Sequence, residues 1–352
     1  MKTNNLVSLI FLLLVSGAVT IAAGSKEEQK VEGKEKFDAS TFILDHIADS
    51  HEWHLFGEGE SSVAIYLPVI LYDKGSGLHV FSSRNLAHGH VYEGFRLEEE
   101  GDLKGKIVKV DSAGQVDENN LPLDFSMTKT VVAMLSAALL GLILFISLAR
   151  SYKKTGISHP KGIQGFLEPV VLFVRDDIAV PNLGHKADRY MPYLLTAFTF
   201  IIINNVMGLI PFPPPFGGNV TGNIAVTFVL AACTLLITQF SANKNHWRHV
   251  FATPGVPLWL LPIMIPVEII GLFSKPFALM IRLFANIAAG HIVVLSLISL
   301  IFIFDSIGLA PVSMVFVIFM DFMELLVAFL QAYIFTLLSA LFISLAIAEE
   351  HH

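Results

Sequence analysis

Long apolar segments dominate the second half of this chain and restrict what it can fold into. Three have the length of one bilayer crossing, at residues 131–148, 191–210 and 223–240, and two are longer, at 256–304 and 311–347. A crossing helix needs about 20 apolar residues, so the two longer segments predict tilted or broken helices. Because backbone polar groups in lipid must be paired within the structure, the pattern predicts an all-α polytopic membrane protein with five crossings.

The composition supports a membrane location. The chain is 54% hydrophobic and 15% charged, whereas soluble domains carry about 25% charged residues. Its net charge of −7 is uneven, because residues 24–127 hold 20 of the 30 acidic side chains but only 10 of the 23 Lys and Arg. An acidic soluble segment therefore precedes a nearly neutral membrane part. Nothing in the chain is basic enough to indicate a nucleic-acid partner.

The first 23 residues have the pattern of a signal peptide. Lys2 supplies the positive end, residues 6–19 the apolar core, and small residues precede Gly24. The alternative is an uncleaved anchor helix, and either interpretation places residues 24–127 outside the cytoplasm. This exterior (periplasmic) extension contains a charged linker, followed by strand-like runs at 62–72 and 106–110 between Gly, Asp and Ser turns. We therefore expect a small, partly β exterior domain.

The exterior extension is rich in histidine, which raises the question of a metal site. The histidines are His46, His51, His54, His79, His88 and His90. Their spacings match no strong ligand pattern, so we expect neither a metal nor another cofactor in this chain.

The distribution of positive charge predicts the orientation. Seven Lys and Arg lie between the first two crossings, namely Arg150, Lys153, Lys154, Lys161, Arg175, Lys186 and Arg189. The connection around Lys244 and Arg248 adds two more, whereas 211–222 and 305–310 have none. Since positive loops stay in the cytoplasm, the N-terminus is expected outside and the C-terminus in the cytoplasm. The apolar run 165–174 within the first loop predicts a cytoplasmic surface helix.

Arg282 is the most informative single residue. It lies in the fourth apolar segment, where Glu268 and Lys275 are the only other formal charges. An arginine at a bilayer centre costs roughly 2.5–3.5 kcal/mol, so it usually has a function and a partner. The alternative is snorkelling to the membrane interface from near a helix end. Glu268, Lys275 and Arg282 repeat every seven residues, so an unbroken helix would carry them as one stripe.

The last two long, tilted helices are expected to form a hairpin around residues 305–308. In an antiparallel pair, two residues at the same height are equally far along the chain from the turn. Their residue numbers therefore add to about twice the number at the centre of the turn. His291 with Glu324 meets this condition, and so does Arg282 with Gln331. An intramembrane histidine and carboxylate that face a bundle interior more often mark an ion path than a contact that only holds the two helices together. Both interpretations remain open from the residues alone.

Several segments resemble subunit a of the F-type ATP synthase, the stator of its membrane sector. They are SKPFALMIRLFANIAAGH (274–291), PVEII (266–270), NNVMGLIP (204–211), TGNIAVTF (221–228) and LQAYIFTLLSALFISLAIAEEH (330–351). The resemblance covers about 131–352. It divides the chain into a signal peptide (1–23), an exterior extension (24–127) that is largely outside the resemblance, and a membrane domain (128–352).

The resemblance implies a role for particular residues at the rotor. Arg282 would be the stator arginine facing a rotating ring of c subunits. Gln331 would be its partner on the last helix, and Asn286 a polar neighbour. The subunit would provide two offset half-channels for protons to and from the c-ring carboxylates, coupled to ATP synthesis.

The resemblance also implies the proton paths. His291 and Glu324 would form a relay pair, exchanged relative to some bacterial members. Glu268 would line the cytoplasmic path, and Asn205 would be the asparagine that the family carries on its third helix, also in the proton path. Gly208 stands where some members carry an aspartate, so the exterior route is the least defined part.

The implied partners are the c-subunit ring, the b-subunit peripheral stalk, the remaining ATP synthase subunits and the lipid of a bacterial inner membrane. No G-x-x-x-x-G-K-[ST] pattern occurs, so ATP chemistry would belong to other subunits. Alternatives are a sodium-translocating version, a secondary transporter or channel acting alone, or a scaffold whose exterior domain binds a partner. No inverted repeats are visible to support a transporter.

Overall fold

A computed structural model describes residues 39–56, 63–99, 101–111, 115–117, 120–155, 162–210, 214–251, 257–304 and 307–348. The predicted signal peptide and charged linker lie outside these residues. The chain divides into two compact units. One contains the chain through Ser136 together with residues 210–218 and 296–318, and the other contains residues 137–209, 219–295 and 319–352.

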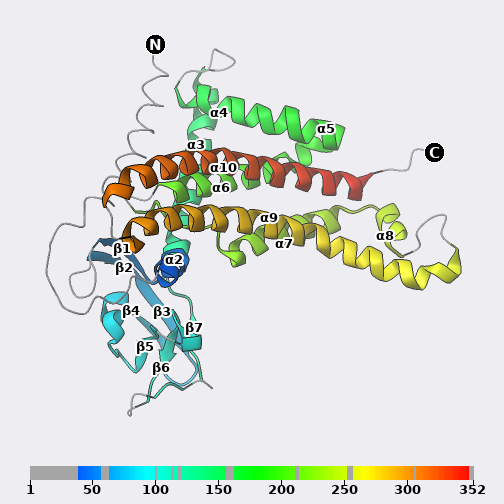
Figure 1. Cartoon of the computed structure of the whole chain (residues 1–352). Helices are drawn as coiled ribbons and strands as arrows, with labels where there is room; N and C mark the ends of the chain where they lie inside the picture. The colour runs from blue at the N-terminus through cyan, green and yellow to red at the C-terminus, as the bar shows by residue number, and fades with distance from the viewer. Residues whose placement is uncertain are drawn as a thin grey trace. The chain divides into compact units, whose positions relative to one another are not determined.

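The N-terminal region is a set of short antiparallel strands (Figure 1). Its elements are α2 (Ala39–Ile47), β1 (Glu52–Phe56), β2 (Val63–Tyr66), β3 (Pro68–Asp73), β4 (Gly77–Ser82), η2 (Ser83–Gly89), β5 (Phe95–Leu97), η3 (Gly101–Leu103), β6 (Ile107–Lys109) and β7 (Leu123–Asp124). β1 pairs with β2, β3 lies between β4 and β7, and β5 pairs with β6. The strand-like runs predicted at 62–72 and 106–110 are confirmed.

Strand β3 organises the core of this region. Val69 and Leu71 point inward and are fully buried, in a cluster with Leu86, Phe95 and Ile107. Asp73 continues the inward face and accepts a hydrogen bond of 2.7 Å from Lys109 Nζ on β6. The hydrogen bonds from Lys109 and Ser76 hold the pKa of Asp73 well below its usual range. The pair therefore stabilises the region at neutral pH, and its contribution is lost as the pH falls through the folded-state pKa.

Helices form the rest of the chain. They are α3 (Lys129–Thr155), α4 (Ile163–Leu172), the π-helical η4 (Phe173–Ala179), α5 (Val180–Leu183), η5 (Gly184–Lys186), α6 (Ala187–Leu209), α7 (Ile224–Ser241), α8 (Lys244–Phe251), η6 (Leu258–Leu260), α9 (Leu261–Ile303), η7 (Ile307–Leu309) and α10 (Ala310–Ile347). Five segments among the described residues are long and apolar enough to cross a membrane: α3, the run from α4 through α6, α7, α9 and α10. The prediction of five apolar segments that form long helices is confirmed.

Helices α9 and α10 lie side by side and antiparallel (Figure 1). The fourth apolar segment was expected to be tilted or broken, and α9 runs unbroken for 43 residues although Pro266 and Pro276 lie inside it. Proline is tolerated in membrane helices because neighbouring helices and small local adjustments pair the freed backbone groups. Glu268, Lys275 and Arg282 therefore lie along one side of a continuous helix.

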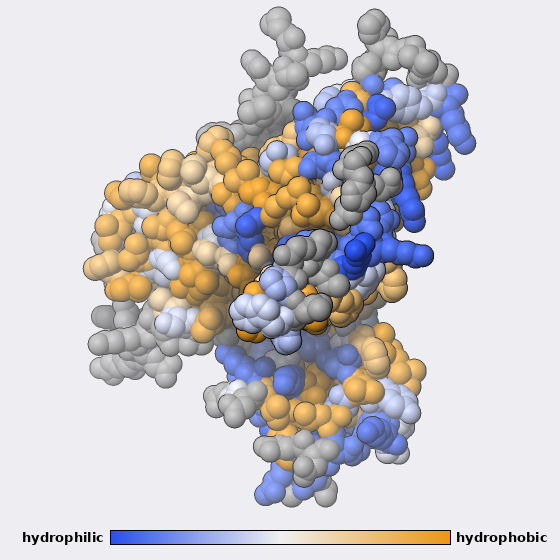
Figure 2. All heavy atoms as spheres, turned by 90° about the vertical axis from the view of Figure 1, so that its right-hand side faces the viewer, coloured by the Kyte–Doolittle hydropathy of each residue, from blue (hydrophilic) through white to orange (hydrophobic). Residues whose placement is uncertain are grey.

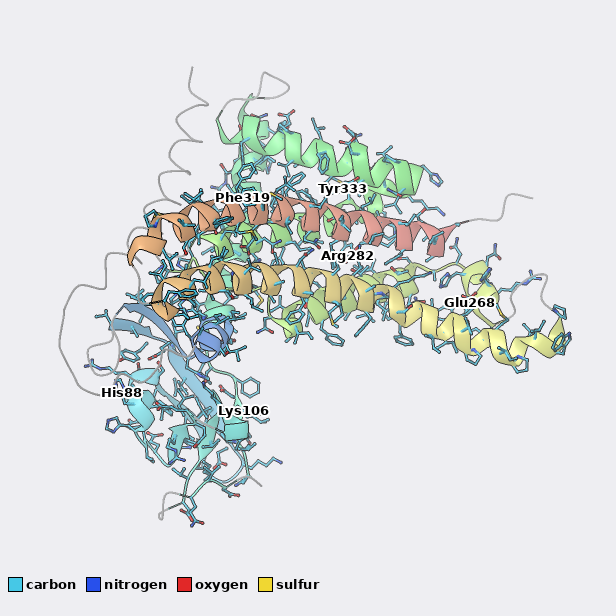
Figure 3. The ribbon with its side chains drawn as sticks, viewed as in Figure 1. His88, Lys106, Glu268, Arg282, Phe319 and Tyr333 are labelled. Atoms are coloured by element: carbon cyan, nitrogen blue, oxygen red, sulfur yellow. The ribbon has the colours of Figure 1, made fainter. Side chains whose placement is uncertain are left out.

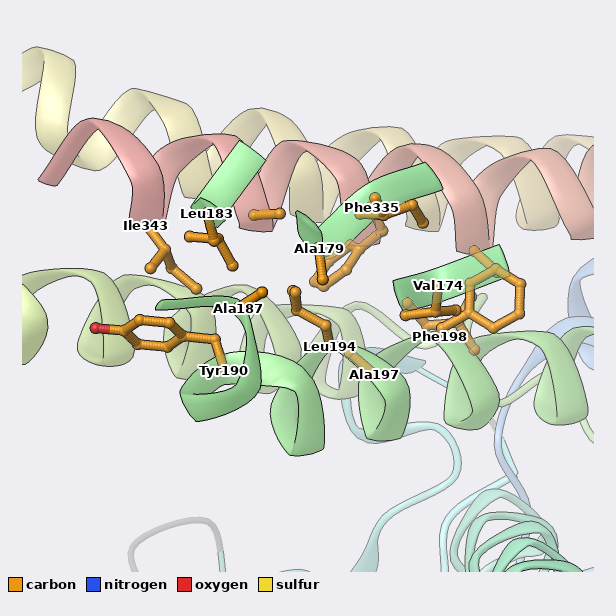
Figure 4. Packing of buried hydrophobic residues seen from close by; sticks show 14 of the residues in the cluster. Val174, Ala179, Leu183, Ala187, Tyr190, Leu194, Ala197, Phe198, Phe335 and Ile343 are labelled. Atoms are coloured by element: carbon orange, nitrogen blue, oxygen red, sulfur yellow. The ribbon is translucent and has the colours of Figure 1, made fainter. Parts of the chain in front are cut away.

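The helical core is formed by the α4–α5 segment, α6, α9 and α10, and Figure 4 shows part of it. Val174, Ile178 and Ala179 of η4 are fully buried there with Phe198 of α6 and Ile343 of α10. The run 165–174 is thus helical and leads into a segment that packs on the bundle. Its predicted position at the membrane surface stays a prediction. Outside the core, hydrophobic side chains cover broad areas of the face in Figure 2, as lipid contact requires.

Residues from two loops form hydrogen bonds with the C-terminal end of α10. Lys186 Nζ donates to the carbonyl of Ile347 at 3.3 Å, and Asn243 Nδ2 donates to the same carbonyl at 2.8 Å. Asn243 N also donates to the carbonyl of Ala346 at 3.0 Å. A cation and an amide at a helix C-terminus stabilise its free carbonyls. The end of the first positive loop, the α7–α8 connection and the end of α10 therefore share one side of the helical unit.

Candidate functional site

A histidine–carboxylate pair joins the two long helices. His291 Nδ1 of α9 lies 2.8 Å from Glu324 Oε1 of α10, and the Glu324 side chain is 6% exposed. The predicted pairing of these residues is confirmed. A hydrogen bond with an ionised partner is short and strong, and burial reduces its screening by solvent. The pair is thus a buried polar contact between helices that are otherwise almost entirely apolar.

Gly290 explains how Glu324 comes this close to α9. A Cβ atom at Gly290 would lie only 2.7 Å from Glu324 Oε1. Real Cβ atoms do not approach other atoms so closely, so the carboxyl would have to move. A larger residue before His291 would therefore displace the Glu324 carboxyl from its present position.

We expect Gly290→Ala to reduce proton pumping by about tenfold, because the displaced Glu324 loses its contact with His291. The measurement is ATP-driven proton uptake by membrane vesicles, normalised to assembled complex.

Gly271→Ala is the matched control, since a Cβ at Gly271 on the same helix meets nothing within 4 Å. Alanine also has the higher helix propensity at both sites. Pumping equal to wild type in Gly290→Ala would show that the close approach is unimportant.

Arg282 faces away from the helical core. Its side chain is exposed and forms no hydrogen bond or ion pair with the described residues. Leu279 and Leu283, on the inner side of α9, are buried in the core. The exposed stripe around Arg282 consists of Ala278, Ala285, Asn286 and Ala289. Figure 3 shows Arg282 midway along α9.

Gln331 and Arg282 differ in environment. Gln331 is 4% exposed in the isolated chain, and no hydrogen bond joins it to Arg282. The predicted partnership of these two residues is thus not a hydrogen bond in this structure. Asn286 is exposed one turn after Arg282, as its spacing predicts.

Glu268 lies near the start of α9, beside α8. Its Oε1 is 3.9 Å from His249 Nδ1. His246, one turn earlier on α8, has a pKa lowered by burial and by the charge of Lys275. These two histidines did not appear among the sequence candidates, because the 244–248 segment was interpreted only as an orientation signal.

Asn205 is buried near the end of α6 and contacts two other elements. Its Nδ2 donates to the carbonyl of Ala328 on α10 at 3.3 Å, and Thr221 Oγ1 donates to its Oδ1 at 2.5 Å. Ala328 lies one turn after Glu324 on α10. The structure thus brings Asn205 against α10, the helix that carries Glu324.

Asp321 is a further acid that the sequence candidates omitted. It is partly buried on α10, three residues before Glu324, and it acts electrostatically on Glu324 and His291. The i, i+3 spacing of the two acids in an apolar helix was the available signal.

Two histidines of the strand-rich region are paired with acidic side chains. His51 Nε2 lies 3.0 Å from Asp124 Oδ2, and His79 Nδ1 lies 2.6 Å from Glu93 Oε2. Burial by itself would raise the pKa of Asp124, but hydrogen bonds from His51 and Ser126 outweigh it and lower the pKa. Among the described residues, no group of three or more His, Cys, Asp and Glu side chains has the arrangement of a metal site.

Five long apolar helices, a buried histidine–carboxylate pair and an outer-face cation without a partner among the described residues are the features of an ion-translocating membrane subunit. Residues 131–344 match the family ATP synthase A chain. The chain belongs to the ATP synthase subunit a family, the proton-channel subunit of the Fo stator. It works with other ATP synthase subunits.

Similar proteins come from several bacteria. ATP synthase subunit a of Chloroherpeton thalassium is 48% identical over 235 residues, covering 65% of this chain and 69% of the relative. The subunit of Myxococcus xanthus is 46% identical over 238 residues, covering 65% and 76%. That of Pelodictyon phaeoclathratiforme is 44% identical over 261 residues, covering 71% and 75%. Residues 42–125 match a domain of unknown function (DUF8433).

Proposed function

We propose that this subunit moves protons through two offset paths, that Arg282 separates the paths, and that the c ring carries protons between them. The observation that carries the proposal is the exposure of Arg282 on an apolar helix face without a partner among the described residues. An unpaired cation at that depth is costly, so an anion from another subunit is expected opposite it. The alanines beside it allow a rotor helix to approach closely.

The exterior path ends at His291 and Glu324. A histidine is suited to relay because its unperturbed pKa is about 6.5. The contact of 2.8 Å between His291 and Glu324 allows a proton to pass between them. Asn205 of α6 contacts α10 one turn beyond Glu324 and holds this part of α10 in place through its hydrogen bond to the carbonyl of Ala328.

At the rotor, a proton from this path neutralises a c-ring carboxylate. The neutral acid can face lipid, where an ionised acid would be costly. After nearly a full turn it releases its proton into the cytoplasmic path, which Glu268 and His249 line. Arg282 favours the ionised carboxylate between the two paths. Because a guanidinium stays protonated, it also blocks direct leakage.

We assign the subunit to the bacterial plasma membrane, with its N-terminus outside and its C-terminus in the cytoplasm. The positive loops indicate this orientation. The hydrogen bonds of Lys186 and Asn243 to the end of α10 support it, since they keep both positive connections at the C-terminal side. The b-subunit stalk is the further partner we expect.

Disulfide crosslinking tests the proposed rotor face. In a Cys233→Ser background, we expect Ala285→Cys to crosslink to a cysteine placed beside the c-ring carboxylate. Phe277→Cys is the matched control, because Phe277 is 59% exposed but lies about 140° around α9 from Arg282. Crosslinks from Phe277→Cys and none from Ala285→Cys would contradict the proposal. Isolation of an active subunit without a c ring would favour a transporter acting alone.

A further inference from the structure

Asp321 is a partly buried acid of α10. Its side chain forms no hydrogen bond or ion pair with the described residues, although it is partly buried in an apolar helix. Glu324, by contrast, holds His291 across the helix pair. A carboxylate without such a contact does not stabilise the helix pair, because an unpaired acid among apolar side chains carries a desolvation cost. Stability therefore does not explain why an acid stands at this position.

Asp321 is nevertheless close to the relay pair. It lies three residues before Glu324 on α10, about 4.5 Å along the helix axis and on a neighbouring side. Among the described residues, Glu324 from its own helix and His291 from α9 are the titratable groups whose charge acts on it. The three side chains therefore form one acid–base cluster.

The order of the polar residues along α10 indicates which of them lies nearest to the exterior. Asp321 comes first after the hairpin turn, then Glu324, then Gln331. With the C-terminus in the cytoplasm, Asp321 lies on the exterior side of Glu324, and Gln331 lies on the other side. A proton that arrives from outside thus reaches the level of Asp321 before that of the relay pair.

We propose that Asp321 is the outermost proton-relay residue of the exterior path, and this inference rests on the proposed function. Its carboxylate takes a proton from exterior water and becomes neutral. It then releases that proton to the carboxylate of Glu324, directly or through one water, and returns to the ionised form. Glu324 passes the proton on through His291, so the cluster is regenerated after each transfer.

The test uses the complete ATP synthase in vesicles, driven to make ATP by an imposed proton gradient. We expect Asp321→Asn to slow ATP synthesis per assembled complex by about tenfold or more. The loss should grow as the exterior pH rises, because proton capture becomes limiting when protons are scarce. Formate added on the exterior side should restore part of the rate by carrying protons to the pair.

Asp321→Glu is the matched variant and should keep the wild-type pH profile. Should Asp321→Asn reduce assembly, Asp321→Ser is measured in the same way, per assembled complex. A wild-type rate and pH profile in the assembled neutral variants, or a loss that is equal at every pH and insensitive to formate, would overturn the proposal. Arg282→Ala in parallel vesicles separates the two questions, because coupled synthesis in that variant would contradict the proposed function itself.

Discussion

Arg282→Ala should abolish ATP-driven proton pumping while the subunit remains inserted in the membrane. Arg282 is exposed and unpaired among the described residues, so its removal breaks no hydrogen bond or ion pair there. What disappears is the fixed positive charge that favours the ionised rotor carboxylate. The measurement is proton uptake by vesicles on ATP addition, normalised to the amount of assembled complex.

A second measurement distinguishes loss of coupled pumping from loss of the separation between the two proton paths. Passive proton flow through vesicles stripped of the ATPase part should rise in Arg282→Ala, because no permanent cation then separates the two paths. Lys275→Ala is the matched control, since Lys275 is an exposed cation one heptad away on the same helix. Arg282→Lys should be a poor replacement, because the pKa of a lysine falls readily on burial. Coupled pumping that survives Arg282→Ala would remove the arginine from the mechanism.

Exchanging the relay pair should preserve more activity than changing either residue alone. His291→Glu places two carboxylates in contact, and Glu324→His places two imidazoles in contact. Each single change leaves like groups across a distance of 2.8 Å in a buried site. We expect each to lower pumping by about tenfold or more. The double exchange restores one acid and one imidazole and should recover part of that loss.

The exchange is measured as pumping rate and as the amount of complex in the membrane. A recovered rate with unchanged assembly indicates chemical coupling between the two side chains. Equal losses in all three variants would contradict a coupled relay. The separate Gly290→Ala variant disturbs the same contact without altering either titratable group, so its rate should resemble that of the single changes.

Several features of the fold could be predicted from local sequence. The lengths of the apolar segments predicted the positions of the five long helices. Strand-like runs between Gly, Asp and Ser turns predicted the positions of β3 and β6. Helix periodicity and the short hairpin turn predicted that His291 meets Glu324. Whether α9 is broken or continuous was harder to predict, because Pro276 is compatible with both forms of the helix. Neighbouring helices decide between them, and their packing is not local information.

Composition, apolar length and residue spacing were enough to predict the class of the protein, its five apolar segments, the relative heights of its polar residues and its family. Helix packing, which these patterns do not encode, places Arg282 on the outer side of α9 and buries Gln331. Packing also brings Glu324 against Gly290 and leaves Asp321 without a hydrogen bond or ion pair among the described residues. These facts depend on how three or more helices pack together, and packing between helices sets exposure and contact at positions that are far apart in the chain.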